Sequence, residues 1–295
     1  MNKTVVNASL LIFIILTWGY SWVLMKIGLQ FFGPFTFAAW RCGVGGLVML
    51  PFLIHNKITL PKRDKLLDYL MIGLFQTTLM FGLMLYGMRF VTAGKTAVLL
   101  YTMPIWTSLI LQFVLKEKLN SLKWIGVLLG SLGILSILGW DTLVNQDLKI
   151  FMGEVLIISG AISWAISNIL IKKRMDREDP YIVNAFQLLI GTIGLILLAI
   201  PFERTLDGIW TIKSIFIILF TGVVASSVNF TLWFYLLKKL DINTATFSSM
   251  LVPVFGLFLD WMILGNRLDP GVIIGSVLII LGIFLVSKRQ NPSSL

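Results

Sequence analysis

The chain has 295 residues, of which 57% are hydrophobic and only 13% are charged, and its mean hydropathy is +0.91. Soluble domains carry about 25% charged residues, so this composition excludes a water-covered globular protein and indicates one that is solvated by lipid. The single histidine and single cysteine exclude a zinc site built from these residue types. We therefore expect no metal and no cofactor.

Ten apolar runs are long enough to cross a hydrocarbon core of about 30 Å as helices. In chain order they cover residues 5–25, 33–54, 67–88, 93–115, 121–139, 151–171, 181–200, 212–236, 242–264 and 270–287. Short connections join them. The sequence thus predicts an all-α integral membrane protein with ten transmembrane helices and the lipid bilayer as a partner.

The net charge of +10 follows the predicted topology. When the N-terminus is placed inside, most lysines and arginines fall at the inner ends of the runs, such as Lys172, Lys173 and Arg174. This distribution is the positive-inside pattern. It predicts a multi-pass protein of a bacterial cytoplasmic membrane with both termini in the cytoplasm, and it gives no reason to expect a nucleic-acid partner.

The chain repeats itself at an offset of about 149 residues. This offset pairs Pro104 with Pro253, and glycines of the fifth run with glycines of the tenth. A slightly smaller offset pairs Trp18 with Trp164 and Pro34 with Pro180. Because each copy holds five runs, an odd number, the second copy enters the membrane from the opposite side. The sequence thus predicts two inverted five-helix repeats, 1–145 and 146–295, as in many secondary transporters.

At these residues the chain resembles the drug/metabolite transporter superfamily, in particular its ten-span EamA branch. The resemblance rests on "TAGKTAVL" at 92–99, the mid-run Pro104, the acidic Glu117 of "KEKL" and the glycines of the fifth run. It implies a membrane carrier of small metabolites, often an exporter, and not an enzyme. The chain departs from the family where Asn266 stands in place of a second acid, so a gating role implied for Glu117 is not duplicated.

"AGKT" at 93–96 looks like the end of a phosphate-binding loop, but Arg89 stands where that loop needs a glycine. The sequence therefore argues against an ATP site and for transport driven by a gradient or by facilitated diffusion.

Charged residues within the apolar runs have two interpretations. Arg41 lies inside the second run, where a charge costs at least about 2.5 kcal/mol on insertion scales. It can bind an anionic substrate group or pair with a gating carboxylate, or it can snorkel outward or cap backbone carbonyls. Asp260 and Glu154 can lie at the interface, or can form an outer gate or a proton-linked carboxylate that pairs with Arg41.

Polar and aromatic residues at helical spacing predict a cavity lined by hydrogen-bonding groups and aromatic walls. The alternative is that they form hydrogen bonds between helices. The candidates are Trp18, Ser21, Arg41, Gln76, Thr77, Tyr101, Trp164, Asn168, Asn229, Trp233 and Ser248.

Pro104 and Pro253 are expected to bend two oppositely oriented helices, and with Glu117 and Asp260 they form the predicted hinge and gate set. Glycines such as Gly126, Gly130 and Gly282 are expected to allow close helix packing, either within the fold or in a dimer. The sequence predicts a secondary exporter of small solutes such as amino acids, acting as a monomer or homodimer. The alternative is a membrane sensor or scaffold that binds a lipid or metabolite.

Overall fold

The computed structural model describes residues 3–55, 63–116, 121–140, 147–203, 206–239 and 251–287, which are almost entirely helical. The first half contains α1 (Lys3–Gly28), α2 (Pro34–His55), η1 (Arg63–Lys65), α3 (Leu66–Ile72), η2 (Gly73–Leu79), α4 (Met80–Gly87), α5 (Ala93–Leu100), α6 (Met103–Phe113) and α7 (Ser121–Trp140). The second half contains α8 (Leu148–Arg174), α9 (Pro180–Glu203), α10 (Ile212–Leu219), η4 (Phe220–Val228), α11 (Asn229–Lys239), α13 (Leu251–Leu264) and α14 (Pro270–Ser287).

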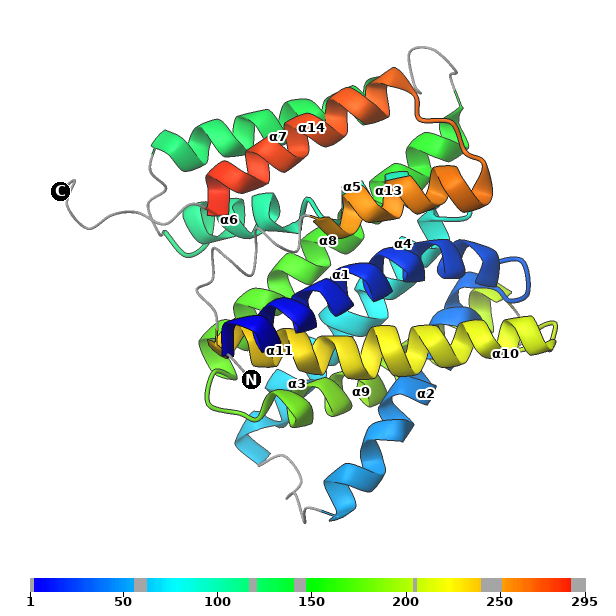
Figure 1. Cartoon of the computed structure of the whole chain (residues 1–295). Helices are drawn as coiled ribbons and strands as arrows, with labels where there is room; N and C mark the ends of the chain where they lie inside the picture. The colour runs from blue at the N-terminus through cyan, green and yellow to red at the C-terminus, as the bar shows by residue number, and fades with distance from the viewer. Residues whose placement is uncertain are drawn as a thin grey trace.

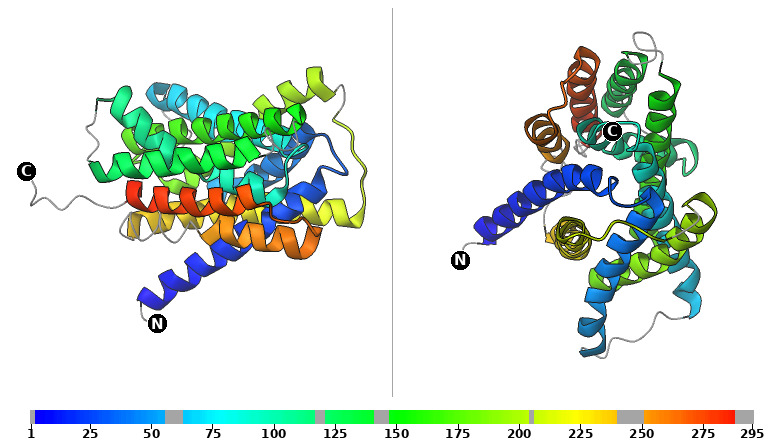
Figure 2. Two further views of the ribbon diagram at one scale, coloured as in Figure 1. Left: turned by 90° about the horizontal axis from the view of Figure 1, so that it is seen from above. Right: turned by 90° about the vertical axis from the view of Figure 1, so that its right-hand side faces the viewer.

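The helices lie side by side in one bundle, with α7 and α14 at one edge and α2 and α9 toward the other (Figure 1). Seen from above, the N-terminal part of α1 projects from the bundle (Figure 2). Within the described residues, six helical segments are long and apolar enough to cross a membrane, and α7, α13 and α14 include shorter apolar stretches. The chain is therefore a multi-helix membrane protein. The ten-span count stays a prediction, because part of the ninth run lies outside the described residues.

Two prolines that the sequence repeat pairs with each other start helices. Pro34 is the first residue of α2, and Pro180 is the first residue of α9. Proline suits the first turn, because its fixed φ matches the helix and the missing N–H has no partner there. At the opposite end of α9, the Glu203 carboxylate accepts hydrogen bonds from the backbone N–H groups of Phe35 (2.7 Å) and Thr36 (2.9 Å). This carboxylate therefore caps the N-terminus of α2 from the other half of the chain.

The fourth predicted span is broken rather than bent. α5 ends at Leu100, Tyr101 and Thr102 form a turn, and α6 begins at Met103 with Pro104 in its first turn. The Thr102 hydroxyl donates to the Leu99 carbonyl (2.6 Å) and accepts from the Trp106 indole (3.0 Å). The proline thus opens a second helix directly after this turn, and its expected role as a hinge stays a prediction. The corresponding stretch before Leu251 lies outside the described residues.

Two spans contain a π-helical segment at matching places. The segment η2 interrupts the third span and η4 interrupts the eighth, each within an otherwise α-helical rod. A π-turn hydrogen-bonds from i to i+5, shifts the helical register and is frequent at functional sites. The Ser226 hydroxyl follows this pattern and donates to the carbonyl of Thr221, five residues earlier (2.8 Å).

Glycines bring α7 and α14 into direct backbone contact. A Cβ atom at Gly282 would lie 2.6 Å from the Gly126 carbonyl oxygen and 2.6 Å from the Gly130 nitrogen. A Cβ at Gly133 would lie 2.7 Å from the Gly275 carbonyl oxygen. These glycines therefore serve packing within the fold, as one of the two sequence interpretations held.

Contacts between the two halves occur in matched pairs. α2 packs against η4, and α9 packs against η2. α1 packs against α13, while α8 packs against α5 and α6. α2 also packs against α9, as α7 does against α14. Helices that the sequence repeat pairs with each other thus contact correspondingly paired partners, and the first, third, fourth, sixth and eighth predicted spans meet around the centre of the bundle.

Candidate functional site

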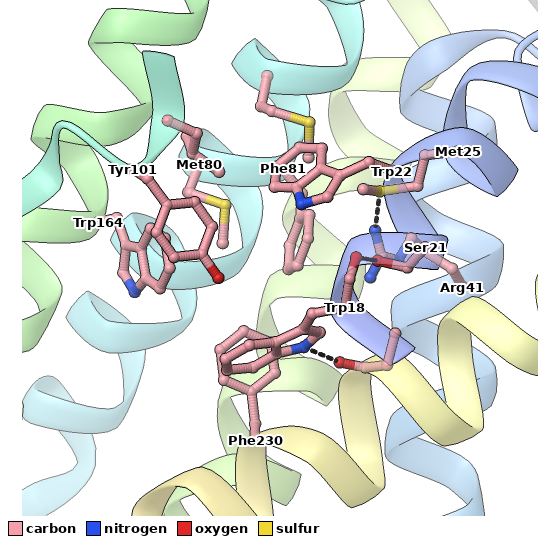
Figure 3. A pocket seen from close by; sticks show the side chains of 13 residues that line it. Trp18, Ser21, Trp22, Met25, Arg41, Met80, Phe81, Tyr101, Trp164 and Phe230 are labelled. Carbon is pink, nitrogen blue, oxygen red and sulfur yellow. Dashed lines mark hydrogen bonds between the residues drawn. The ribbon is translucent and has the colours of Figure 1, made fainter. Parts of the chain in front are cut away.

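A small pocket lies at the centre of the bundle, between the two halves of the chain (Figure 3). Its walls are mostly aromatic and sulfur-containing. It is lined by Trp18, Ser21, Trp22, Met25, Arg41, Met80, Phe81, Met84, Leu100, Tyr101, Trp164, Ala225 and Phe230. Its volume is about 40 Å³, whereas typical ligand sites enclose about 300–1,000 Å³. A metabolite therefore needs helices or side chains to move before it can enter.

Trp18 is fixed by the π-helical segment of the other half. Its indole Nε1 donates to the carbonyl of Ala225 over 2.8 Å. Its ring packs edge-on against Phe230, with 5.3 Å between ring centroids, and tilted against Trp233 at 5.9 Å. The register shift of η4 makes carbonyl groups available to such donors, which an unbroken α-helix would keep for its own ladder. Trp18 thus forms a rigid wall of the pocket.

Arg41 is buried at the same π-helical segment, with 2% of its surface exposed. Its Nη2 donates to the Ser226 hydroxyl (3.0 Å) and the Thr221 carbonyl (3.3 Å). Its Nη1 contacts the Met25 sulfur at 2.5 Å, and the guanidinium lies 4.3 Å from the centroid of the Phe81 ring. Arg41 therefore faces protein, and the pairing with Asp260, one of the alternatives that the sequence left open, is not formed in this conformation.

Tyr101 lies at the break between α5 and α6, and Figure 3 shows its hydroxyl pointing into the pocket. Its ring packs edge-on against Trp164 of α8, with 5.8 Å between centroids. Ser21 donates its hydroxyl hydrogen to the Trp18 carbonyl over 2.7 Å, which leaves its oxygen able to accept. Of the predicted cavity residues, the structure brings Trp18, Ser21, Arg41, Tyr101 and Trp164 together in this pocket.

Gln76 and Thr77 lie in η2 and are fully buried, but they do not line the pocket in this conformation. Thr77 packs against Gly191 of α9, where a Cβ atom would come within 2.2 Å of the Thr77 Cβ. The side-chain amide of Gln76 and the hydroxyl of Thr77 have no hydrogen-bond partner among the described residues. Their role in a cavity stays a prediction.

Asn168, Asn229 and Trp233 connect helices around the pocket. The Asn168 amide contacts the Met103 sulfur at the start of α6 (3.2 Å). The Asn229 amide donates to the Thr17 hydroxyl of α1 (2.8 Å), and Trp233 packs on Trp18. Pro253 is buried near the start of the described part of α13. Ser248 and Glu117 lie outside the described residues.

Charged side chains gather at one end of the bundle, where the sequence interpretation missed Lys95. Lys95 of α5 and Glu154 of α8 form an ion pair of 3.1 Å, and both are buried. Asp260 is also buried, and its Oδ1 accepts from the Asn266 amide (3.0 Å). Lys26 of α1 lies within electrostatic range of Asp260 and donates to the Val91 carbonyl (2.7 Å). Glu154 and Asp260 are therefore enclosed by protein rather than exposed at its surface.

The chain matches the model of the EamA-like transporter family twice, over residues 7–139 and 151–288. It is 34% identical over 277 residues to the uncharacterized transporter YoaV of Bacillus subtilis, covering 93% of this chain and 94% of that protein. An uncharacterized transporter of Archaeoglobus fulgidus is 24% identical over 96% of this chain and 97% of its own length. A solved crystal structure shares the fold, with a TM-score of 0.66, 19% identity and 95% coverage of both chains. The chain therefore belongs to the EamA-like transporter family.

Proposed function

We propose that the chain is a secondary transporter that moves a small amphipathic solute, such as an amino acid, by alternating access. The observation that carries the proposal is the central pocket. Trp18, Arg41 and Tyr101 come from the first half, whereas Trp164 and Phe230 come from the second. A site shared by two halves can be exposed to either side of the membrane when the halves move against each other.

The proposed architecture is a pair of inverted five-helix repeats, 1–145 and 146–295, that span the membrane ten times. The two family matches and the paired contacts between equivalent helices support it. The excess of basic residues at the inner ends supports placing both termini in the cytoplasm of a bacterial cell. Export is the proposed direction. Monomer and homodimer are both compatible with this arrangement. The glycines of α7 and α14 are used within the chain, so a homodimer would form through another surface.

The broken fourth span supplies a place where the halves can move. Tyr101 lines the pocket at the turn that separates α5 from α6. Discontinuous helices at the midplane are typical of transporter binding sites, and backbone that leaves the helix is tolerated where protein or a cavity surrounds it. A hinge motion of α6 relative to α5 would therefore change the access to the pocket.

Purified protein in liposomes tests this function. A panel of labelled amino acids, carboxylates and amines should include a solute whose efflux exceeds that from empty liposomes and saturates with concentration. Liposomes with the Tyr101→Ala variant should lose most of this flux at equal protein content, whereas Trp124→Ala, which alters an exposed residue of α7, should retain it. If no solute of the panel moves faster than in empty liposomes, the proposal fails. The protein would then be better described as a sensor or scaffold that binds its ligand without moving it.

A further inference from the structure

The guanidinium of Arg41 lies at the pocket without a counter-charge. Its partners among the described residues are a thioether, a carbonyl, a hydroxyl and an aromatic ring, all of them neutral. Among the described residues, no carboxylate forms an ion pair with it, and its Nε has no hydrogen-bond partner. A buried charge that is not compensated is expensive. The site therefore has the electrostatic character of one that receives an anion.

The same contacts hold the guanidinium in a fixed position before any ligand binds. Thr221 and Ser226 of η4 accept from Nη2, and Phe81 stacks on the guanidinium plane. The contact of Nη1 is the sulfur of Met25, which is a weak acceptor. An oxygen with a full negative charge would form a stronger hydrogen bond with Nη1 than this sulfur does, because charge-assisted hydrogen bonds are about twice as strong as neutral ones.

The other lining residues determine which chemical class of anion fits the pocket. Among the residues that the structure describes, Arg41 is the one charged residue of the lining, and aromatic residues such as Trp22, Phe81 and Trp164 form about half of it. Ser21 and Tyr101 add neutral hydroxyl groups. A planar guanidinium matches a carboxylate with two parallel hydrogen bonds. The described part of the lining holds no carboxylate that could balance an ammonium group on a ligand.

Resting on the proposed transport by alternating access, and in place of the amino acid given there as an example, we propose that the pocket takes an organic monocarboxylate with an apolar body, rather than a zwitterion or a cation. Arg41 binds the carboxylate, the Tyr101 hydroxyl donates to it, and the aromatic wall packs against the apolar body. The pocket must widen beyond its volume of about 40 Å³ to admit this ligand, and separation of the halves at Tyr101 provides the space.

Binding of matched ligands to the purified wild-type protein tests the proposal without any variant. Benzoate, phenylacetate and 4-methylpentanoate are each titrated beside the primary amide of the same body, with phenylalanine and phenethylamine as the zwitterion and the cation, and heat of binding is measured. At least one carboxylate should bind about 10-fold or more tightly than its amide, since the amide lacks the charge that Arg41 compensates. The proposal is overturned if no carboxylate binds, if the amides bind equally well, or if the zwitterion or the cation binds most tightly.

Substitution of the guanidinium then tests its role. In Arg41→Gln, the ratio of carboxylate to amide affinity should fall to about 1, and Arg41→Lys should restore part of it because the charge returns. The control is Arg89→Gln, which removes an arginine that stacks on Tyr86 away from the pocket and should leave the ratio unchanged. If Arg41→Gln is misfolded by size-exclusion chromatography, Ser226→Ala serves instead, because it keeps the charge and removes one partner of Nη2. An unchanged ratio in a folded Arg41→Gln protein contradicts the proposal.

Transport and binding can fail separately in these experiments. If carboxylates bind with the expected preference but do not cross liposomes that contain the protein, the carboxylate site stands and the transport function is wrong. If liposomes move zwitterionic amino acids and exclude monocarboxylates, the transport function stands and the carboxylate site is wrong.

Discussion

Lys95 of α5 and Glu154 of α8 form a buried ion pair, with 3.1 Å between Nζ and Oε1. The Lys95 side chain is 7% exposed and that of Glu154 is fully buried. The two residues belong to different halves of the chain, so the pair ties α5 to α8 directly. Any motion that separates the halves at this end of the bundle must break it.

We expect removal of one member of this pair to destabilise the protein strongly. Glu154→Gln leaves the Lys95 ammonium buried without this carboxylate, which costs about 3–5 kcal/mol in comparable pairs, and should lower the melting temperature in detergent. The double variant Lys95→Met, Glu154→Leu should recover much of the loss, because both charges of the pair are then removed and neither is left without the other. As a control, Arg174→Gln removes a pair with Asp68 in which the Arg174 side chain is 58% exposed, and it should cost less than about 1 kcal/mol. Equal effects of Glu154→Gln and Arg174→Gln would contradict this expectation.

Trp18→Phe should lower both the stability of the protein and its affinity for solute, although one aromatic ring replaces another. The variant keeps an aromatic ring beside Phe230 but removes the donor to the Ala225 carbonyl. A buried acceptor left unsatisfied costs about 1–3 kcal/mol, so both the melting temperature and the affinity for a transported solute should fall. Trp124→Phe, at an exposed tryptophan of α7, should change neither. A wild-type affinity in Trp18→Phe would show that the indole hydrogen bond does not fix the pocket.

Pro104→Ala should separate stability from transport. The proline lies in the first turn of α6, where its missing N–H costs no helical hydrogen bond, so we expect the stability to change by no more than about 1 kcal/mol. Alanine no longer prevents α5 and α6 from joining into one helix, and the initial rate of flux should therefore fall. Pro201→Ala, inside α9, is the control and should keep the wild-type rate. If Pro104→Ala transports at the wild-type initial rate, the break between α5 and α6 is not needed for transport.

Gly282→Ala should force α7 and α14 apart. The added methyl group would meet the backbone of Gly126 and Gly130 at 2.6 Å, which no side-chain rotation can relieve. Overpacking of this kind costs about 1–3 kcal/mol, measurable as a lower melting temperature. At Gly43 a Cβ would approach only the side chain of Thr192, at 3.2 Å, so Gly43→Ala should be tolerated. If Gly282→Ala and Gly43→Ala have the same melting temperature, the contact between α7 and α14 is less tightly packed than the distances indicate.

Much of the helical architecture could be predicted from the sequence, because its causes are local. Apolar runs of the right length, prolines such as Pro34 at helix starts, and the glycines of α7 and α14 each carry a direct physical signal. The insertion cost of a charge likewise predicted that Arg41 faces protein or water. The structure agrees, since Arg41 is buried and lines the pocket.

Features that depend on tertiary contacts were not predicted. The π-helical segments have no periodicity of their own in the sequence. The hydrogen bond from Trp18 to the Ala225 carbonyl of η4 therefore could not be predicted. The same holds for Lys95 and Glu154, which are 59 positions apart and carry no shared motif. Pocket residues such as Trp22 and Phe81 are apolar residues in apolar helices, and only their placement distinguishes them from lipid-facing neighbours.

Accessibility of the pocket from the two sides of the membrane tests alternating access most directly. A single cysteine is introduced by Ser21→Cys in a Cys42→Ala background, because Ser21 lines the pocket and Cys42 is the chain's one cysteine. Ser121→Cys, at the exposed start of α7, is the control and should react from one side only. If the transporter alternates, a membrane-impermeant maleimide labels position 21 both in whole cells and in inside-out vesicles, and a transported solute changes the ratio of the two labelling rates. Labelling of position 21 from one side only, with or without solute, would contradict it.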